Sequence, residues 1–227
     1  RPLDETNSDL GSRKRLANEK ELVWYPAETD VSIRPGWFYH EEEDDKVRTF
    51  ENLKDIYLKS VGGNTTLLLN LPPMKTGKIH ETDVANLKKL GKFIEDSFKN
   101  SLLKNAVITT VPESDCRGNS PDMMRIDNYD TYFMSEEGEN KLLINIKFDE
   151  YKKLNYLVLK EAIIFSQRVE KFKVFYEDEN GSQRECYTGT TIGYKKIISL
   201  EDIKTDSLII SIEDSRVAPV ISFVGVY

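Results

Sequence analysis

The sequence predicts an α/β part followed by an all-β part within one chain. Between residues 24 and 100, short apolar runs alternate with stretches whose apolar residues recur at helical spacing. From about residue 105, this spacing gives way to alternation of apolar and polar residues, with turn-forming residues between the runs. Several short strands in series are typical of an antiparallel sandwich or jelly roll. We therefore expect two domains, residues 1–104 and 105–227.

Composition indicates a globular protein and argues against a nucleic-acid partner and a membrane span. The 227 residues suffice for one large domain or two modest ones, and a hydrophobic content of 39% argues against disorder. The net charge of −7 argues against a nucleic-acid partner, which requires a basic surface. No run approaches the roughly 20 apolar residues of a membrane span. Since the chain starts at Arg1 without Met, we expect a processed product or a fragment.

The first predicted strand, residues 28–34, has one entirely polar face. A polar loop over residues 1–20, with a solvated basic cluster, precedes it. Because side chains of a strand alternate between two faces, one face carries Glu28, Asp30, Ser32 and Arg34. Such a face either meets solvent or lines a polar site. Pro and Gly then end the strand, and an aromatic run follows at its carboxyl end, where α/β folds place their sites.

The other α/β elements follow in the order helix, strand, helix. Thr49 is the predicted N-cap of a helix that Gly62 and Gly63 end. Residues 65–70 form a continuous apolar run, typical of a parallel strand buried on both faces, and a second helix covers about 82–99. Two strands cannot close a barrel of eight. We therefore expect that an N-terminal portion of this domain lies outside the chain.

In the β part, alternation predicts strands over residues 142–148, 171–176 and 208–213. The loop Asp127–Asp130 carries oxygen ligands that suit calcium, but a turn held by Asx hydrogen bonds is the simpler interpretation. Cys116 and Cys186 are too few and too far apart for a zinc site, and the sequence allows either a disulfide or two free thiols. No aromatic triplet marks a lectin-type site, so we expect the sandwich to pack against the α/β part.

Residues 24–40, WYPAETDVSIRPGWFYH, form the most distinctive stretch. Together with SVGGN at 60–64 and LLLNLPP at 67–73, this stretch resembles the α-L-fucosidases of glycoside hydrolase family 29, and it is closest to the branch selective for α-1,3/1,4-linked fucose. GTTIGYKK at 189–196 resembles the C-terminal sandwich of many of these enzymes. The resemblance covers most of the chain. It implies the last quarter to third of a (β/α)8-like barrel, followed by a galactose-binding-like β-sandwich.

The resemblance also implies an activity, that of a retaining exo-α-L-fucosidase, and assigns the general acid/base to Glu28. The family's nucleophile is an aspartate on an earlier barrel strand, which no position here matches, so we expect the chain alone to be inactive. The acid must hold its proton near neutral pH, which needs burial or a neighbouring negative charge. Asp30 on the same strand face, and the rings of Trp24 and Trp37, would provide these conditions. Asp30 is the second choice for the acid.

Substrate contacts are expected from Trp37, Arg34, His40, Asp30 and Trp24. Trp37 could form an apolar platform for the sugar, although core packing explains it equally well, and Trp24 fits packing better. Arg34 and His40 could donate hydrogen bonds to sugar hydroxyls, but a structural role explains His40 as well. An ion pair with Arg34 is an equally good explanation of Asp30.

Two polar residues nearby have plainer interpretations. Asn70, at the end of the second strand, either touches the site or caps local backbone, and His80 is expected to be structural. The expected partners are a fucosylated oligosaccharide or glycoconjugate and the missing N-terminal part, with no metal or cofactor. We expect a periplasmic or extracellular location. The alternative function is a non-catalytic carbohydrate-binding β-sandwich with an α/β support.

Overall fold

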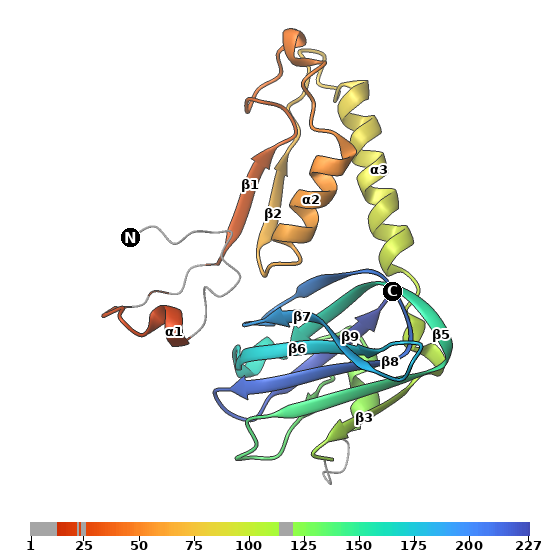
Figure 1. Cartoon of the computed structure of the whole chain (residues 1–227). Coiled ribbons are helices and arrows are strands. Elements are labelled where there is room, and N and C mark those ends of the chain that lie inside the picture. Colours follow the sequence, from red (N-terminus) through yellow and green to blue (C-terminus); the bar gives the residue numbers. More distant parts are fainter. Residues whose placement is uncertain (1–12, 22, 24–25, 114–119) are drawn as a thin grey trace. The chain divides into compact units, whose positions relative to one another are not determined.

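The computed structural model describes residues 13–21, 23, 26–113 and 120–227, which divide into two compact units (Figure 1). One unit, Trp24–Asn100, contains a parallel pair of strands and two helices. The other joins Ser101–Tyr227 to the segment that ends at Val23, and consists mostly of antiparallel sheet. The break follows Asn100, whereas the sequence placed it after residue 104. The described residues before 24 group with the β part.

The α/β unit keeps the predicted order of elements. Strands β1 and β2 pair in parallel, with Glu28 opposite Thr66 and Ser32 opposite Asn70. The bounds are β1 (Glu28–Ser32), the 3-10 helix η1 (Glu41–Glu43), α2 (Phe50–Ser60), β2 (Thr66–Asn70) and α3 (Glu81–Phe98). A small core of Ile33, Val47, Leu53 and Leu90 joins the strands to the helices. β1 is two residues shorter than predicted, because the chain turns before Arg34.

The predicted burial of β2 on both faces is wrong in this structure. Leu68, in the middle of the strand, is 50% exposed, and Thr66 is also exposed. The reason is that β1 is its only strand partner among the described residues and the small core takes only part of its apolar surface. The apolar run is therefore typical of a buried strand, but the described residues cover only part of its apolar surface.

Helix α2 begins at the predicted cap. The hydroxyl of Thr49 accepts a hydrogen bond from the backbone N–H of Asn52 at 3.3 Å, and Glu51 lies in the first turn. This bond satisfies one of the four N–H groups that have no partner within the helix. Hydrogen bonds from the Glu51 backbone and from Thr49 lower the pKa of Glu51 below its ordinary value, although burial opposes this shift.

We expect Thr49→Ala to lower the free energy of unfolding of the α/β unit by about 1 kcal/mol, the usual contribution of such a cap. Urea unfolding followed by tryptophan fluorescence measures this unit selectively, because both tryptophans of the chain lie within residues 24–100. Thr76→Ala is the matched control, since Thr76 is exposed and lies in a turn. Equal stability of the two variants would contradict the capping role.

The β unit is a seven-stranded sheet, and the antiparallel pairing that the sequence predicted is confirmed, while the sandwich or jelly-roll arrangement stays a prediction. Its strand order is β4-β9-β5-β8-β6-β7, and β3 pairs with β5. The bounds are β3 (Val107–Val111), β4 (Phe133–Met134), β5 (Leu142–Glu161), β6 (Val169–Glu177), β7 (Gln183–Gly189), β8 (Lys196–Ser215) and β9 (Val220–Val226). Three 3-10 helices accompany them, η2 (Leu102–Asn105), η3 (Pro121–Arg125) and η4 (Ile163–Phe165).

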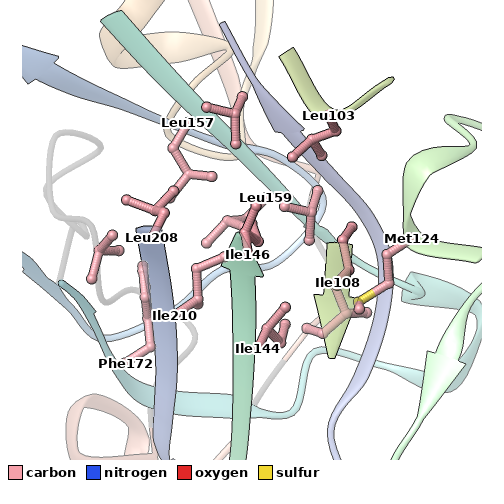
Figure 2. Packing of buried hydrophobic residues seen from close by; sticks show 14 of the residues in the cluster. Leu103, Ile108, Met124, Ile144, Ile146, Leu157, Leu159, Phe172, Leu208 and Ile210 are labelled. Carbon is pink, nitrogen blue, oxygen red and sulfur yellow. The ribbon is translucent and has the colours of Figure 1, made fainter. Parts of the chain in front are cut away.

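The sheet has two sections, and the long strands β5 and β8 extend through both of them. The first part of β5, Leu142–Lys147, pairs with β3 and with the late part of β8. After register shifts, its last part pairs with β9 and with the early part of β8. Buried side chains from both sections, such as Ile144, Leu157 and Leu208, form one hydrophobic cluster (Figure 2). The sequence predicted only the first part of β5, because the alternation is interrupted after residue 148.

A four-residue helix, α1 (Arg13–Leu16), lies where the sequence predicted a loop. The backbone N–H of Arg13 donates a hydrogen bond to Glu170 at 2.8 Å, and its guanidinium donates one to Asp214 at 3.1 Å. The two acceptors lie on β6 and β8. The basic cluster is therefore not simply solvated, since Arg13 binds carboxylates of the sheet, which explains why this segment groups with the β unit.

The described residues lack two kinds of feature. None of their helices combines the length and the apolar character that crossing a membrane requires. No three His, Cys, Asp or Glu side chains among them are grouped so as to hold a metal ion. Cys186 is a half-buried free thiol whose pKa burial raises to about 11, while Cys116 lies outside the described residues.

Candidate functional site

The predicted polar face of β1 begins with two exposed carboxylates. Glu28 and Asp30 both point their side chains out of the α/β unit, and neither carboxylate has a hydrogen bond or ion pair with the described residues. Ser32 on the same face is buried. The face therefore changes along the strand, from solvent at Glu28 to protein interior at Ser32. The chain's own described residues do not bury Glu28, contrary to the shelter expected for a proton-holding acid.

The carboxyl ends of β1 and β2 hold the turn that carries the aromatic run. The amide nitrogen of Asn70 donates hydrogen bonds to the Ser32 hydroxyl at 3.0 Å and to the Trp37 carbonyl at 3.1 Å. The Ser32 hydroxyl in turn donates to the Gly36 carbonyl at 2.7 Å. Of the two roles considered for Asn70, the structure supports the one in which its side chain binds local backbone. Its contacts hold the turn in place.

The ring of Trp37 lies outside the hydrophobic core. Its side chain is 52% exposed, and that of the neighbouring Phe38 is 78% exposed. Core packing therefore does not explain Trp37 in this structure. A half-exposed indole beside polar backbone leaves a flat apolar surface open to a ligand. Trp24, the other predicted aromatic, lies outside the described residues.

Arg34 has a structural role that differs from the predicted sugar contact. Its guanidinium is completely buried and forms two hydrogen bonds with Asp83, both at 2.9 Å, and an ion pair with Asp44 at 2.8 Å. It also donates to the His40 carbonyl at 3.3 Å. Burial lowers the pKa of Arg34, but the bonds to Asp83 and Asp44 outweigh burial and leave the pKa above its ordinary value. Arg34 therefore pairs with Asp83 and Asp44, and the pair with Asp30 considered as an alternative does not form; its contact with a sugar stays a prediction.

Asp44 links this buried pair to the surface. The Tyr39 hydroxyl donates to Asp44 at 3.1 Å, the Tyr39 ring lies 4.6 Å from the Arg34 guanidinium, and the His80 imidazole lies 3.4 Å from Asp44. Burial raises the pKa of Asp44, but the bonds from Arg34 and Tyr39 and the nearby His80 outweigh it, so the net shift is downward. Sequence reasoning missed Asp44, Tyr39 and Asp83, because none of them stands in a local pattern that indicates a shared arginine.

The two histidines behave differently. The Nδ1 atom of His80 accepts a hydrogen bond from the backbone N–H of Thr82 and caps α3, in agreement with the structural role that we expected. His40 is exposed, and its side chain makes no capping bond at the start of η1. Its carbonyl accepts from Arg34, so the backbone is held while the imidazole faces outward.

The predicted residues do not converge on one point. Ser32 lies four steps of extended strand beyond Glu28, which corresponds to roughly 13 Å. Trp37 is held at the Ser32 end, through Asn70. Glu28 at the start of β1 and Trp37 beyond its end thus mark the two ends of one strand. The backbone positions therefore do not by themselves place the Trp37 ring beside Glu28, where we expected it to help shield the carboxyl group from water.

The loop before β4, residues 127–130, is a turn held by Asx hydrogen bonds, the simpler of the two interpretations of this loop. The side-chain oxygen of Asn128 accepts from the backbone N–H groups of Asp130 at 2.9 Å and Thr131 at 2.8 Å. The Asp127 carboxylate pairs with the ammonium group of Lys160 at 2.6 Å. These contacts explain the loop by Asx hydrogen bonds, and they use the side-chain oxygen of Asn128 and one carboxylate oxygen of Asp127.

Comparison with known proteins gives one consistent family. Residues 6–98 match the family model described as Alpha-L-fucosidase. Alpha-L-fucosidase 1 of Arabidopsis thaliana is 33% identical over 211 residues, which is 90% of this chain and 41% of that protein. The chain thus spans about two fifths of the length of this curated relative.

Two solved structures are also similar to this chain. A Ruminococcus gnavus fucosidase of glycoside hydrolase family 29, solved in complex with fucose, is 30% identical with a TM-score of 0.84, and the match covers 92% of this chain and 42% of that one. A second structure, SpGH29, is 27% identical with a TM-score of 0.81, and the match covers 89% of this chain and 44% of the SpGH29 chain. The similarity extends across both units of the chain.

Proposed function

We propose, because residues 6–98 match the family model described as Alpha-L-fucosidase, that this chain is the carboxyl-terminal part of a retaining exo-α-L-fucosidase of glycoside hydrolase family 29. The whole enzyme would remove terminal α-1,3/1,4-linked L-fucose from glycans. The observation that carries the proposal is the family match across the stretch that contains Glu28. Similarity to fucosidases over 90% of the chain supports it.

Glu28 is the proposed general acid/base. In a retaining glycosidase, one carboxylic acid protonates the leaving oxygen and later activates water, while a second carboxylate about 5 Å away attacks the sugar. Glu28 suits the first role because its carboxylate is not held by any described residue and remains available to a substrate. Asp30, two residues along the same face, is the alternative acid. The nucleophile would come from a part of the enzyme outside this chain.

The two-stranded sheet supports the proposal that further barrel strands complete this unit. An isolated parallel pair is unusual, since parallel strands are normally covered on both faces. Leu68 in β2 is half exposed, and the start of β1 faces solvent. Neighbouring strands and helices of a (β/α)8-like barrel would cover both, and would supply the low-dielectric surroundings that a proton-holding Glu28 needs.

The remaining site residues take different parts in this proposal. Trp37 would offer its exposed ring to an apolar sugar face, and the outward imidazole of His40 would reach a hydroxyl. Trp24 is also a proposed substrate contact. Arg34 becomes a positioning residue, because its bonds to Asp83 and to the His40 carbonyl fix the loop between β1 and α2.

The β unit would be the galactose-binding-like module that follows the barrel. The proposed partners are a fucosylated glycan and the upstream part of the enzyme, and the proposed location is the periplasm or the extracellular space, where such glycans occur.

The test compares residues 1–227 with the complete enzyme on an α-1,4-linked fucosyl oligosaccharide. We expect the complete enzyme to release fucose and the chain alone to release none above buffer, because a retaining enzyme needs both carboxyl groups. Release of fucose by residues 1–227 alone would overturn the claim that the nucleophile lies elsewhere. Failure of the complete enzyme on every fucoside tested would overturn the activity itself.

A further inference from the structure

Asn70, the last residue of β2, connects both strands of the α/β unit to the turn that follows β1. It lies opposite Ser32 in the parallel register, and its carbonyl accepts a hydrogen bond from the backbone N–H of Ile33 at 3.0 Å. Its side-chain nitrogen uses both of its hydrogens, one on the Ser32 hydroxyl at 3.0 Å and one on the Trp37 carbonyl at 3.1 Å. An ionised carboxyl group of the same shape has no hydrogen to donate, so both contacts require the amide.

The buried Ser32 hydroxyl extends the reach of Asn70 by one residue of the turn. It accepts from the Asn70 amide and donates to the Gly36 carbonyl at 2.7 Å. Asn70 therefore acts on two consecutive carbonyl groups, directly on that of Trp37 and through Ser32 on that of Gly36. Linked hydrogen bonds of this kind strengthen one another, so losing the Asn70 donor weakens the hold on both.

The direction of the Trp37 ring depends on this backbone. The side chain is 52% exposed, and the indole makes no hydrogen bond or ring contact with the part of the chain that the structure describes. The hydrophobic core therefore does not fix the ring, and the carbonyl contacts at residues 36 and 37 define where its side chain starts. A binding surface that is held before the ligand arrives loses less conformational freedom on binding.

We propose that Asn70 is a positioning residue for substrate binding, which acts by holding the Trp37 backbone so that the ring faces the sugar. This inference rests on the proposed function, in which Trp37 offers its ring to an apolar sugar face. Both hydrogens of the Asn70 amide are used within the protein, so Asn70 acts without donating to the sugar. Its effect should therefore fall on substrate affinity and spare the proton transfer.

The kinetic test is Asn70→Asp in the complete enzyme, with an α-1,4-linked fucosyl oligosaccharide as substrate. We expect KM to rise about tenfold and kcat to stay within about threefold of the wild type, the pattern of lost uniform binding. Asn70→Ala, which removes the donor without adding a charge, should give the same pattern. A fall in kcat with KM unchanged in both variants would overturn the proposal.

Asn86→Asp is the matched control for these measurements. The Asn86 amide also donates to a backbone carbonyl of the α/β unit, that of Arg48, at 3.0 Å, and this acceptor lies outside the turn of Gly36 and Trp37. The control should leave KM and kcat unchanged. A rise in KM as large as that of Asn70→Asp would mean that any lost amide contact in this unit has the same effect, and would contradict a specific role for Asn70.

A double-mutant cycle shows whether Asn70 acts through Trp37. In an enzyme that carries Trp37→Ala, adding Asn70→Asp should change KM by less than about twofold, because the ring that Asn70 positions is gone. A residue with a merely structural role would give the full further rise in KM. Such additive behaviour would show that Asn70 does not act through Trp37.

Fluorine NMR separates this inference from the proposed activity. In the complete enzyme labelled with fluorotryptophan, the Trp37 signal is the one that disappears in Trp37→Phe. We expect Asn70→Asp to shift or broaden this signal and Asn86→Asp to leave it in place. An unchanged signal in Asn70→Asp would refute the positioning of Trp37, whether or not the enzyme is active. A changed signal in an enzyme that releases no fucose would support the positioning and count against the proposed function alone.

Discussion

Replacing Glu28 by Gln in the complete enzyme should lower kcat/KM for an α-1,4-linked fucosyl oligosaccharide about 10³-fold, in the middle of the range for lost general acid catalysis. The oxygen that leaves in this substrate is a poor leaving group, and it needs a proton as the bond breaks. An amide cannot supply that proton. The measurement is initial-rate kinetics with purified wild-type and variant enzymes at matched concentration and pH.

The matched control for this prediction is Asp30→Asn. Asp30 is two residues along the same exposed face of β1, so the change has the same chemistry in nearly the same surroundings. We expect its kcat/KM to stay within about tenfold of the wild type, because Asp30 would not transfer the proton. A large loss in Asp30→Asn with near-normal activity in Glu28→Gln would exchange the two assignments.

A second substrate separates acid catalysis from loss of structure. With an activated aryl fucoside, the leaving group needs little protonation, so Glu28→Gln should form the fucosyl-enzyme and then hydrolyse it slowly. Azide should accelerate this second step, because the small anion attacks without a general base. Wild-type activity of Glu28→Gln on the oligosaccharide, or loss on both substrates without azide rescue, would contradict the assignment of Glu28 as acid/base.

Local pattern was sufficient to predict the elements of the α/β unit. Helix α2 begins at the capping threonine that the sequence indicates, and α3 begins one residue before the predicted start. These features depend on residues three or four apart, so sequence spacing contains them. Burial of β2 was not predicted correctly, because it depends on which other elements cover the strand.

Long-range pairing explains the contacts that the sequence did not reveal. Arg34 was placed on the same strand face as Glu28 and Asp30, but the chain turns after Ser32 and the guanidinium meets Asp83, 49 residues away. Tyr129 and Tyr194 meet across 65 residues, which is why no aromatic cluster was visible in the sequence. Such contacts follow from the folded topology, and alternation within one strand does not contain them.

The second large effect concerns stability and follows from the buried pair. We expect Asp83→Ala to lower the free energy of unfolding of the α/β unit by about 3–5 kcal/mol, because it leaves the Arg34 charge buried without its two-bond partner. Asp44 lies 2.8 Å from Arg34 but is partly exposed, so it compensates only in part. Urea unfolding followed by tryptophan fluorescence reports this unit, since both tryptophans belong to it.

Asp55→Ala is the matched control for that measurement. Asp55 pairs with Lys59 at 2.9 Å on the surface of α2, with both side chains more than half exposed. Exposed pairs of this kind contribute about 0.3–0.5 kcal/mol, so this variant should unfold almost as the wild type does. The double variant Arg34→Met with Asp83→Leu should recover much of the loss, because it removes the unpaired charge along with its partner. If Asp83→Ala were no less stable than Asp55→Ala, Arg34 would have to find other compensation, and its role in fixing the loop after β1 would be wrong.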